Sequence, residues 1–175
     1  MIKKIALVVP VLVVAVLAYA ATKPDTLHVQ RNAGVKAPPE EIFPLINDFH
    51  RWTSWSPYEK RDPGMKRTYS GPAQGKGAVY EWEGNSEVGQ GRMEITDTSD
   101  PSRVTIKLDF IKPIEGHNVA EFALVPQGGT TNVTWSMDGP SPFIGKLIGV
   151  FVNMDTMIGR DFETGLANLK TIAEE

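Results

Sequence analysis

The chain has 175 residues, no cysteine, and 18 lysines and arginines against 21 aspartates and glutamates. This length suits one folded domain with a short addition, because a domain usually takes roughly 100–200 residues. Without cysteine, the chain has no disulfide, thiol nucleophile or thiolate metal site. The acidic balance, together with the lack of any block of lysine or arginine, argues against nucleic acid as a partner.

An uncharged apolar run lies near the N-terminus. It follows Lys3 and Lys4 and extends over 17 residues, Ile5–Ala21. At 1.5 Å per residue it reaches about 25 Å, just under the roughly 30 Å hydrocarbon core of a bilayer. We therefore expect residues 1–22 to be a signal anchor whose residues 5–21 cross the cytoplasmic membrane, with the domain on the outer side. The alternative is a signal peptide cleaved near Ala18–Ala20, which would release the domain into the periplasm.

A hinge over residues 23–26 leads into the folded domain, which we expect to span residues 27–175. Apolar and polar residues alternate enough over Leu27–Ala37 to predict a strand, which two prolines end. The next stretch, PPEEIFPLINDF, opens with prolines and glutamates, as the first turn of a helix does. Pro44 within it predicts a short or irregular helix. Phe49–Lys60 reads FHRWTSWSPYEK, which is too broken for a helix or strand and predicts a loop holding two tryptophans.

Six short runs follow, separated by Gly, Pro, Asn, Asp and Ser, as the strands of an antiparallel meander are. In the later runs apolar residues fall on alternate positions, so one face of the sheet is apolar and the other is polar. The runs are Met65–Gly71, Gly77–Gly84, Gln90–Ser99, Arg103–Ile111, His117–Gln127 and Thr131–Gly139.

The C-terminal segment predicts a long amphipathic helix that covers the apolar face. From Ser141, the expected N-cap, apolar residues recur every three or four positions up to Glu175. Several glycines weaken this helix by up to about 1 kcal/mol each and predict a kink or break near Asn153. The fold class is therefore α+β, with a curved antiparallel sheet of about seven strands wrapped around a long C-terminal helix.

The order of these elements, with APPEEIF opening the first helix, NDFHRWTSWSPYEK after it and the GKGAVYEWEGN hairpin, resembles the SRPBCC superfamily. The resemblance covers residues 27–175 and is to the polyketide cyclase/dehydrase-like branch of membrane-tethered bacterial proteins. It implies a helix-grip fold with an apolar cavity between sheet and helix. It implies ligand binding only broadly, because the superfamily includes lipid carriers, polyketide cyclases, quinone binders and chaperone activators.

No catalytic group stands out among the polar residues. His28, His50 and His117 lie in three different elements without a metal-binding pattern, so we expect surface or loop-packing residues. Glu81 and Glu83 share one face of a strand whose other face carries aromatic residues, so both are expected to point into solvent. The loop Gly71–Gly77 departs from the phosphate-binding pattern and is expected to be a hairpin turn. The sequence predicts no catalytic residue, no metal and no cofactor.

The aromatic and methionine residues predict the binding site. Two tryptophans on an irregular segment suggest a lid over an apolar pocket, and the alternative is that they simply plug the end of the domain. The candidate ligand-binding residues are Trp52, Trp55, Tyr58, Tyr80, Trp82, Met93, Phe110, Phe122, Trp135, Phe151 and Met154.

We expect a module that binds a hydrophobic small molecule or lipid in an apolar cavity. One alternative is a polyketide cyclase or dehydratase-like enzyme, and another is a protein-interaction module of the chaperone-activator kind. The sequence does not predict an oligomeric state. Ligand binding and cyclase activity both require unfilled apolar space between the sheet and the last helix.

Overall fold

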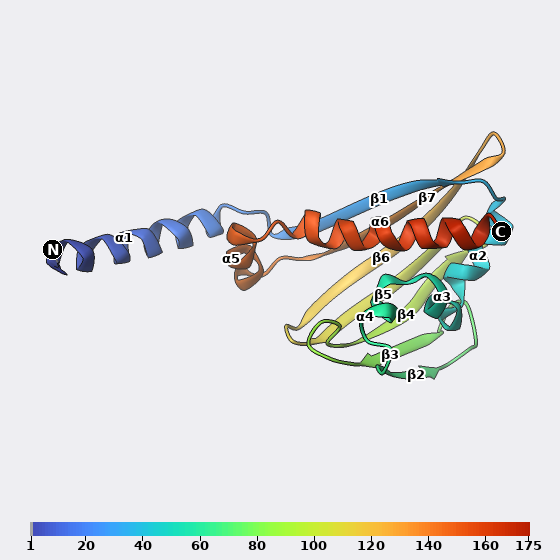
Figure 1. Ribbon diagram of the computed structural model, residues 1–175, viewed down its shortest axis with the longest axis horizontal. Helices are drawn as coiled ribbons and strands as arrows, with labels where there is room; N and C mark the ends of the chain where they lie inside the picture. Colours follow the sequence, from blue (N-terminus) through green and yellow to red (C-terminus); the bar gives the residue numbers. More distant parts are fainter. Residues whose placement is uncertain (1) are drawn as a thin grey trace.

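A curved seven-stranded sheet dominates the computed structural model, which describes residues 2–175 (Figure 1). The elements in chain order are α1 (Ile2–Ala21), β1 (Thr26–Val35), α2 (Pro39–Asn47), the 3-10 helix η1 (Phe49–Arg51), α3 (Trp52–Trp55), α4 (Pro57–Arg61), β2 (Lys66–Ser70), β3 (Val79–Glu83), β4 (Gln90–Ser99), β5 (Arg103–Lys112), β6 (Gly116–Gln127), β7 (Thr130–Pro140), α5 (Phe143–Phe151) and α6 (Met154–Ala173).

The strand order in the sheet is β1-β7-β6-β5-β4-β3-β2, and every neighbouring pair is antiparallel. Strands β2 to β7 form the meander that the six short runs predict. The first strand joins β7 at the far edge. The alternation also holds: on β3, Tyr80 and Trp82 are buried while Glu81 and Glu83 are exposed. The predicted α+β helix-grip architecture is confirmed.

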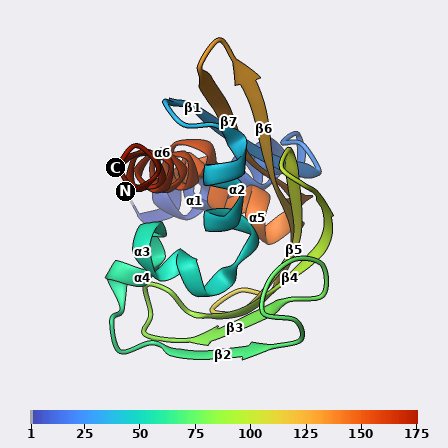
Figure 2. The same ribbon diagram turned by 90° about the vertical axis from the view of Figure 1, so that its right-hand side faces the viewer.

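Helix α6 lies across the concave face of the sheet beside β1, while α2 packs on β5 and β6, and α3 and α4 pack beside α6 (Figure 2). The apolar stripe of α6 explains this packing, because Phe162, Leu166 and Leu169 are all buried. Gly165 lets the helix approach closely, since a Cβ there would lie 2.7 Å from Cζ3 of Trp135. The core therefore sits between α6, the short helices and the sheet.

The C-terminal helix is divided where the glycines predict a break. Helix α5 ends at Phe151, and α6 begins at Met154 after Asn153, whose side chain accepts the N–H of Thr156 at 3.0 Å. Such a cap satisfies one of the free N–H groups of a first helical turn and so favours a new helix start. The expected N-cap at Ser141 is wrong, because Pro142 is the N-cap of α5.

Helix α1 projects from the sheet and packs beside α5 (Figure 1). Among the described residues, no helix combines the length and apolar character that a bilayer span needs. The predicted single-pass location in the cytoplasmic membrane, with the domain on its outer side, is therefore wrong. The uncharged apolar run has 17 residues, fewer than the roughly 20 consecutive apolar residues that a spanning helix usually has.

The tryptophan segment is more ordered than the predicted loop. Residues 49–61 form η1, α3 and α4 in close succession. The carboxylate of Asp48 caps η1 by accepting the N–H of His50 at 2.9 Å. Pro57 opens α4, where its missing N–H costs no hydrogen bond. These helices have three to five residues, which is too short for an apolar period to show in the sequence.

Candidate functional site

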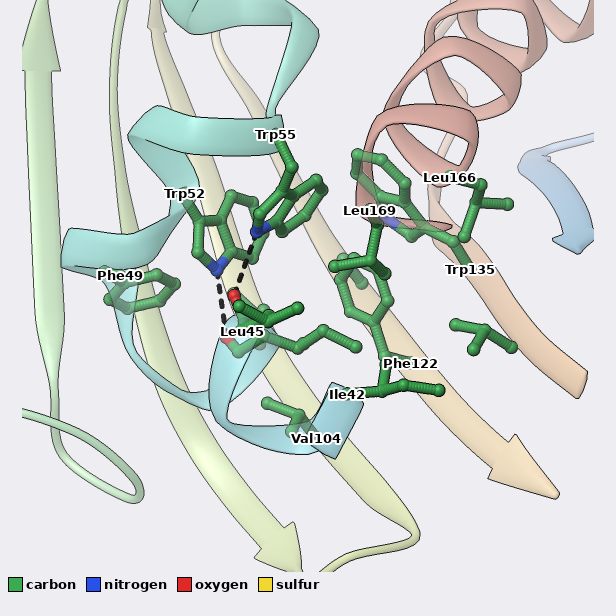
Figure 3. Packing of buried hydrophobic residues seen from close by; sticks show 14 of the residues in the cluster. Ile42, Leu45, Phe49, Trp52, Trp55, Val104, Phe122, Trp135, Leu166 and Leu169 are labelled. Carbon is green, nitrogen blue, oxygen red and sulfur yellow. Dashed lines mark hydrogen bonds between the residues drawn. The ribbon is translucent and has the colours of Figure 1, made fainter. Parts of the chain in front are cut away.

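The concave face of the sheet has two parts that differ in packing. In the first, which we call the closed half, aromatic rings fill the space between α3, α6, β6 and β7 (Figure 3). Trp135 stacks on Phe162 with ring centroids 4.0 Å apart, and Phe122 stacks on Trp135 at 4.8 Å. Trp52 and Trp55 meet both Phe122 and Trp135 edge to face, with centroids 5.7–6.3 Å apart. Such arrangements are favourable for aromatic pairs.

The two tryptophans of the broken segment lie inside this cluster. Their exposed fractions are 4% for Trp52 and 0% for Trp55. Nε1 of Trp52 donates to the carbonyl of Ile46 and Nε1 of Trp55 to that of Leu45, both at 2.9 Å (Figure 3). These carbonyls lie in the last turn of α2, where intrahelical partners are missing. The tryptophans thus fix α2 against α3, and their N–H groups are already used. Whether either indole contacts a ligand stays a prediction.

The second part is the opposite end of the same face. On β5, Val104 and Ile106 are fully buried, whereas Leu108 and Phe110, further along the same face, are only partly buried. We call this region the open end. It includes five partly buried residues, Leu27, Tyr58, Leu108, Phe110 and Ile158, beside three almost fully buried ones, Trp82, Met93 and Met137.

Strand register explains why these side chains meet. Leu108 stands opposite Met93 on β4 and Asn118 on β6, while Phe110 stands opposite Gly91 on β4. The ring of Trp82 lies where a Cβ at Gly91 would be, so only glycine fits there. Trp82 then reaches across β4 to meet Phe110 edge to face, at 6.1 Å. The sheet thereby presents a continuous apolar surface with Asn118 as its polar member.

Two arginine contacts hold α6 on either side of this surface. Arg61 of α4 forms an ion pair with Asp161 of α6, and its guanidinium lies 5.3 Å from the centre of the Tyr58 ring. Burial, with the nearby charge of Asp161, raises the pKa of the Tyr58 hydroxyl above its usual range. Tyr58 is therefore a neutral hydrogen-bonding group at ordinary pH.

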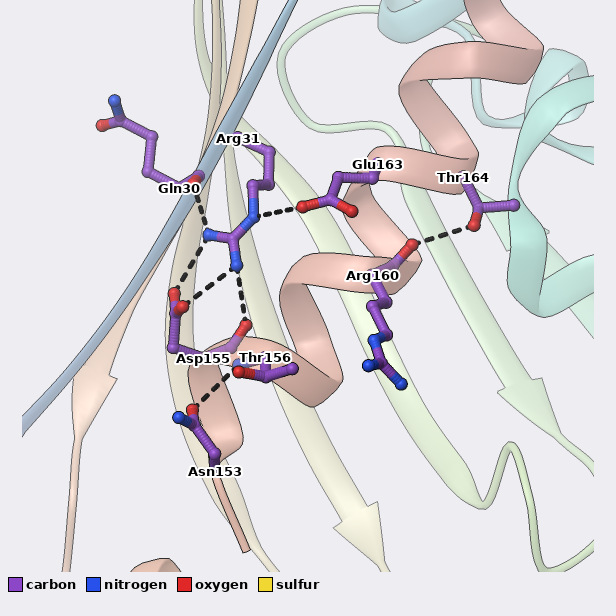
Figure 4. Close-up of polar contacts among 8 residues, drawn as sticks. All are labelled: Gln30, Arg31, Asn153, Asp155, Thr156, Arg160, Glu163 and Thr164. Atoms are coloured by element: carbon purple, nitrogen blue, oxygen red, sulfur yellow. Dashed lines mark hydrogen bonds and ion pairs between the residues drawn. The ribbon is translucent and has the colours of Figure 1, made fainter.

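On the other side, Arg31 of β1 binds α6 through several contacts (Figure 4). Its Nε donates to Glu163 at 2.7 Å, and its terminal nitrogens donate to the side chain and the carbonyl of Asp155 at 3.0 Å. These hydrogen bonds lower the pKa of the Asp155 carboxyl. Charge-assisted hydrogen bonds of this kind also fix geometry, so α6 is held in one position over the sheet.

A buried ion pair lies between the open end and the edge strand β2. Glu59 is 7% exposed, and its carboxylate accepts Nε of Arg67 and the hydroxyl of Tyr80, each at 2.7 Å. Burial and this hydrogen bond raise the pKa of Tyr80 above its usual range. Sequence reasoning missed this pair, because Glu59 lies in a four-residue charged stretch, EKRD, that reads as solvated surface.

The structure distributes the predicted binding residues over four places. The closed half holds Trp52, Trp55, Phe122 and Trp135, and Tyr80 lies on the buried ion pair. The open end holds Tyr58, Trp82, Met93 and Phe110, and Met154 begins the helix beside it. Phe151 is 74% exposed in α5 and meets residues of α1 instead. The sequence pattern also placed Leu108 on the face of Phe110, and this signal could have added it to the site.

The polar residues form pairs without a metal-binding cluster. Over residues 2–175, no group of three or more His, Cys, Asp or Glu side chains is arranged to hold a metal ion. The three histidines each pair with one aspartate through Nδ1: His28 with Asp138, His50 with Asp48, and His117 with Asp109. All three imidazoles are more than half exposed, as expected for surface residues.

Comparison with known proteins gives a family match over most of the chain. The family model described as "Polyketide cyclase / dehydrase and lipid transport" matches residues 26–174. Among curated proteins, no sequence matches the chain.

Solved structures share the fold at low sequence identity. A major latex-like protein from Panax ginseng has a TM-score of 0.62 at 15% identity, covering 87% of this chain and 100% of its own. The Aha1 dimer from Colwellia psychrerythraea has a TM-score of 0.60 at 16% identity, covering 85% of this chain and 96% of its own. The di-domain ARO/CYC protein BexL of the BE-7585A biosynthetic pathway has a TM-score of 0.64 at 12% identity, covering 91% of this chain and 53% of its own.

Proposed function

Because the chain belongs to the polyketide cyclase/dehydrase and lipid transport family of the SRPBCC superfamily, we propose that it binds a hydrophobic small molecule or lipid at the open end. One observation carries this proposal. Leu108 and Phe110 stay partly exposed on a face whose other residues, Val104 and Ile106, are fully buried. Covering this surface with an apolar ligand removes it from water, which is worth about 25 cal/mol per Å².

The lining suits an adaptable apolar guest. Met93 and Met137 supply flexible side chains that adjust to irregular shapes. Trp82 is fixed, because its Nε1 donates to the carbonyl of Val88 at 2.9 Å, so its ring offers a rigid wall beside Phe110. A rigid wall with soft neighbours lets related ligands bind without a change of backbone.

Asn118 gives the ligand its orientation. It stands opposite Leu108 in the sheet, and its carboxamide lies over Gly139, where a Cβ would displace it. In the part of the chain that the structure describes, this carboxamide has no hydrogen-bond partner on another side chain. A ligand with one carbonyl or hydroxyl group among apolar atoms would satisfy it, since an unmet polar group under a ligand costs roughly 1–3 kcal/mol. The ligand we propose is therefore mainly apolar with one polar group.

Binding of the neutral apolar dye N-phenyl-1-naphthylamine tests the proposal through energy transfer from tryptophan. Phe110→Ser removes apolar lining, so the affinity should fall at least tenfold, because burying a phenylalanine contributes roughly 1.5–3 kcal/mol and each 1.4 kcal/mol is about a factor of ten. The matched control is Ile111→Ser, because Ile111 is the next residue on β5 and is 49% exposed on the opposite face. Equal affinities for both variants would contradict a site at the open end.

The natural ligand can be sought directly. We expect native mass spectrometry of the purified chain to show a bound species that extraction into an organic solvent removes. The same purification of Phe110→Ser should show less of that species, while Ile111→Ser retains it. Retention of the species by both variants would place the binding surface elsewhere.

A further inference from the structure

A separate cavity lies between η1 and the loop that joins β2 to β3. Its volume is about 240 Å³, and its lining includes Phe49, His50, Tyr69, Pro72 and Ala78. An apolar cavity of ~150 Å³ is enough to admit benzene, so this one has room for a single substituted ring. It is beside the edge strand β2, and β3 and β4 separate it from Phe110 on β5.

Three residues of the lining carry polar side-chain groups, His50, Tyr69 and Ser70, and the imidazole of His50 is the one with a free hydrogen-bond acceptor nitrogen. Nδ1 lies 3.0 Å from Oδ1 of Asp48, and the ring stacks on Tyr69 with centroids 4.1 Å apart. The carboxylate of Asp48 also accepts the backbone N–H of His50, so the pair is held from both sides. A carboxylate on Nδ1 selects the tautomer with its proton there and leaves Nε2 as an acceptor. Where the structure describes side chains, no protein group pairs with this Nε2.

The walls of the cavity are held in place without a ligand. Tyr69 stacks on Tyr80 at 5.1 Å, and Tyr80 is bound to the buried carboxylate of Glu59. The loop is tied down at two points: the N–H of Gly75 donates to the carbonyl of Asn47 at 3.0 Å, and that of Gly77 donates to Ile95 at 2.7 Å. A preformed site loses little conformational entropy when a ligand binds.

We propose that this cavity binds a compact aromatic alcohol of the single-ring phenol class. The ring of the ligand lies against the apolar floor of Phe49 and Ala78, which are 1% and 2% exposed. Its hydroxyl donates a hydrogen bond to Nε2 of His50. The inference does not rest on the function proposed for the open end, because the two surfaces use different strands.

Titration with phenol and with benzene, followed by two-dimensional NMR of the labelled full chain, tests the proposal. Both compounds should shift signals of residues 69–79, and phenol should bind more tightly. His50→Phe keeps an aromatic ring but removes the acceptor, so phenol should bind about five- to tenfold more weakly while benzene is unaffected. His28→Phe is the matched control, since His28 also pairs with an aspartate through Nδ1 but lies outside the cavity.

A second variant covers the case in which His50→Phe does not fold. Ala73 is an exposed loop residue of the lining, and Ala73→Trp should fill the cavity and abolish the shifts caused by both compounds. Three results would each overturn the proposal: no saturable shift with phenol, unchanged phenol affinity in His50→Phe or Ala73→Trp, or shifts centred on Leu108 and Phe110 instead.

Discussion

Among the described residues, Glu59 is the one charged residue that is buried. Its buried carboxylate meets the Nε of Arg67 and the hydroxyl of Tyr80. Glu59→Gln leaves the Arg67 charge without its partner, and because the Arg67 side chain is still 22% exposed, we expect a loss of about 1–3 kcal/mol. Urea unfolding should show this loss. The control is Glu94→Gln, which breaks a half-exposed pair with Arg92 and should cost under ~1 kcal/mol. Equal effects would contradict the burial of Glu59.

His117 predicts a pH dependence on the outer face of the sheet. Nδ1 of His117 donates a hydrogen bond to Oδ1 of Asp109 at 2.7 Å, which raises the pKa of His117, and Glu115 adds to the rise while Lys107 opposes it. The pKa of His117 is therefore higher in the folded state than in the unfolded chain, where it is about 6.5. The stabilisation by this pair is fully present at pH values below the unfolded-state pKa, and it is lost as the pH rises through the folded-state pKa. NMR titration should therefore give a midpoint above 6.5 for His117.

The matched variant for this titration is Asp109→Asn. Without the carboxylate, the midpoint of His117 should return toward about 6.5. The difference in unfolding free energy between the wild type and His117→Gln should be largest near pH 5 and should shrink above neutrality. If this difference in unfolding free energy instead grew as the pH rises, the ion pair between His117 and Asp109 would not stabilise the folded state.

At the level of elements, the contact between α6 and β1 predicts that replacing one helical glycine by alanine destabilises the protein. Gly→Ala inside a helix normally stabilises by up to about 1 kcal/mol. At Gly159 the new Cβ would overlap the guanidinium of Arg31, which Asp155 and Glu163 hold in place. We expect Gly159→Ala to destabilise by about 1–2 kcal/mol through overpacking.

Gly149 in α5 supplies the control for this effect. No atom lies within 4 Å of the Cβ that alanine would add there, so Gly149→Ala should be neutral or stabilising. A double-mutant cycle sharpens the test: in an Arg31→Met background, Gly159→Ala should lose its penalty, because the two residues are coupled only by contact. A penalty that persists in that background would contradict this explanation.

The elements differ in how far their sequences predicted them. On β5 to β7 the alternation of apolar residues identified the buried face, and on α6 the three-to-four spacing identified Phe162, Leu166 and Leu169 as core. Helices α3 and α4 were missed, because four and five residues are too few to show an apolar period, and α3 is held instead by two indole hydrogen bonds to α2. The sequence named Tyr58, Trp82, Met93 and Phe110 but did not separate the open end from the closed half, since the alternation on β5 continues unchanged from Ile106 to Phe110 while the burial does not.

For the whole molecule, the helix-grip arrangement separates stability from binding. The aromatic cluster of the closed half and the contacts of Arg31 and Arg61 with α6 fix the helix on the sheet. The open end can then remain partly uncovered without loosening the fold, because its residues add little to that cluster. Changes at Phe110 should accordingly affect ligand affinity more than the free energy of unfolding.

The position of α1 leads to a prediction about truncation. An apolar groove of about 350 Å³ lies between α1 and α5, lined by Leu12, Val13, Val16, Leu17, Leu147 and Phe151. Apart from Ala20, the core residues of the described chain begin at Val29. A chain starting at residue 23 should therefore keep cooperative urea unfolding, with a free energy within about 1 kcal/mol of the full chain, as is usual for changes outside a core.

Truncation at the other end should have the opposite result. Ending the chain after Gly165 removes ten residues, among them Leu166 and Leu169, which are 1% and 0% exposed. Each buried leucine contributes roughly 2–5 kcal/mol, while a domain has only about 5–15 kcal/mol of stability in total. The shortened chain should lose its cooperative transition, although it loses fewer residues than the N-terminal truncation. If it unfolded cooperatively near the wild-type midpoint, α6 would not be the helix that the sheet is built around.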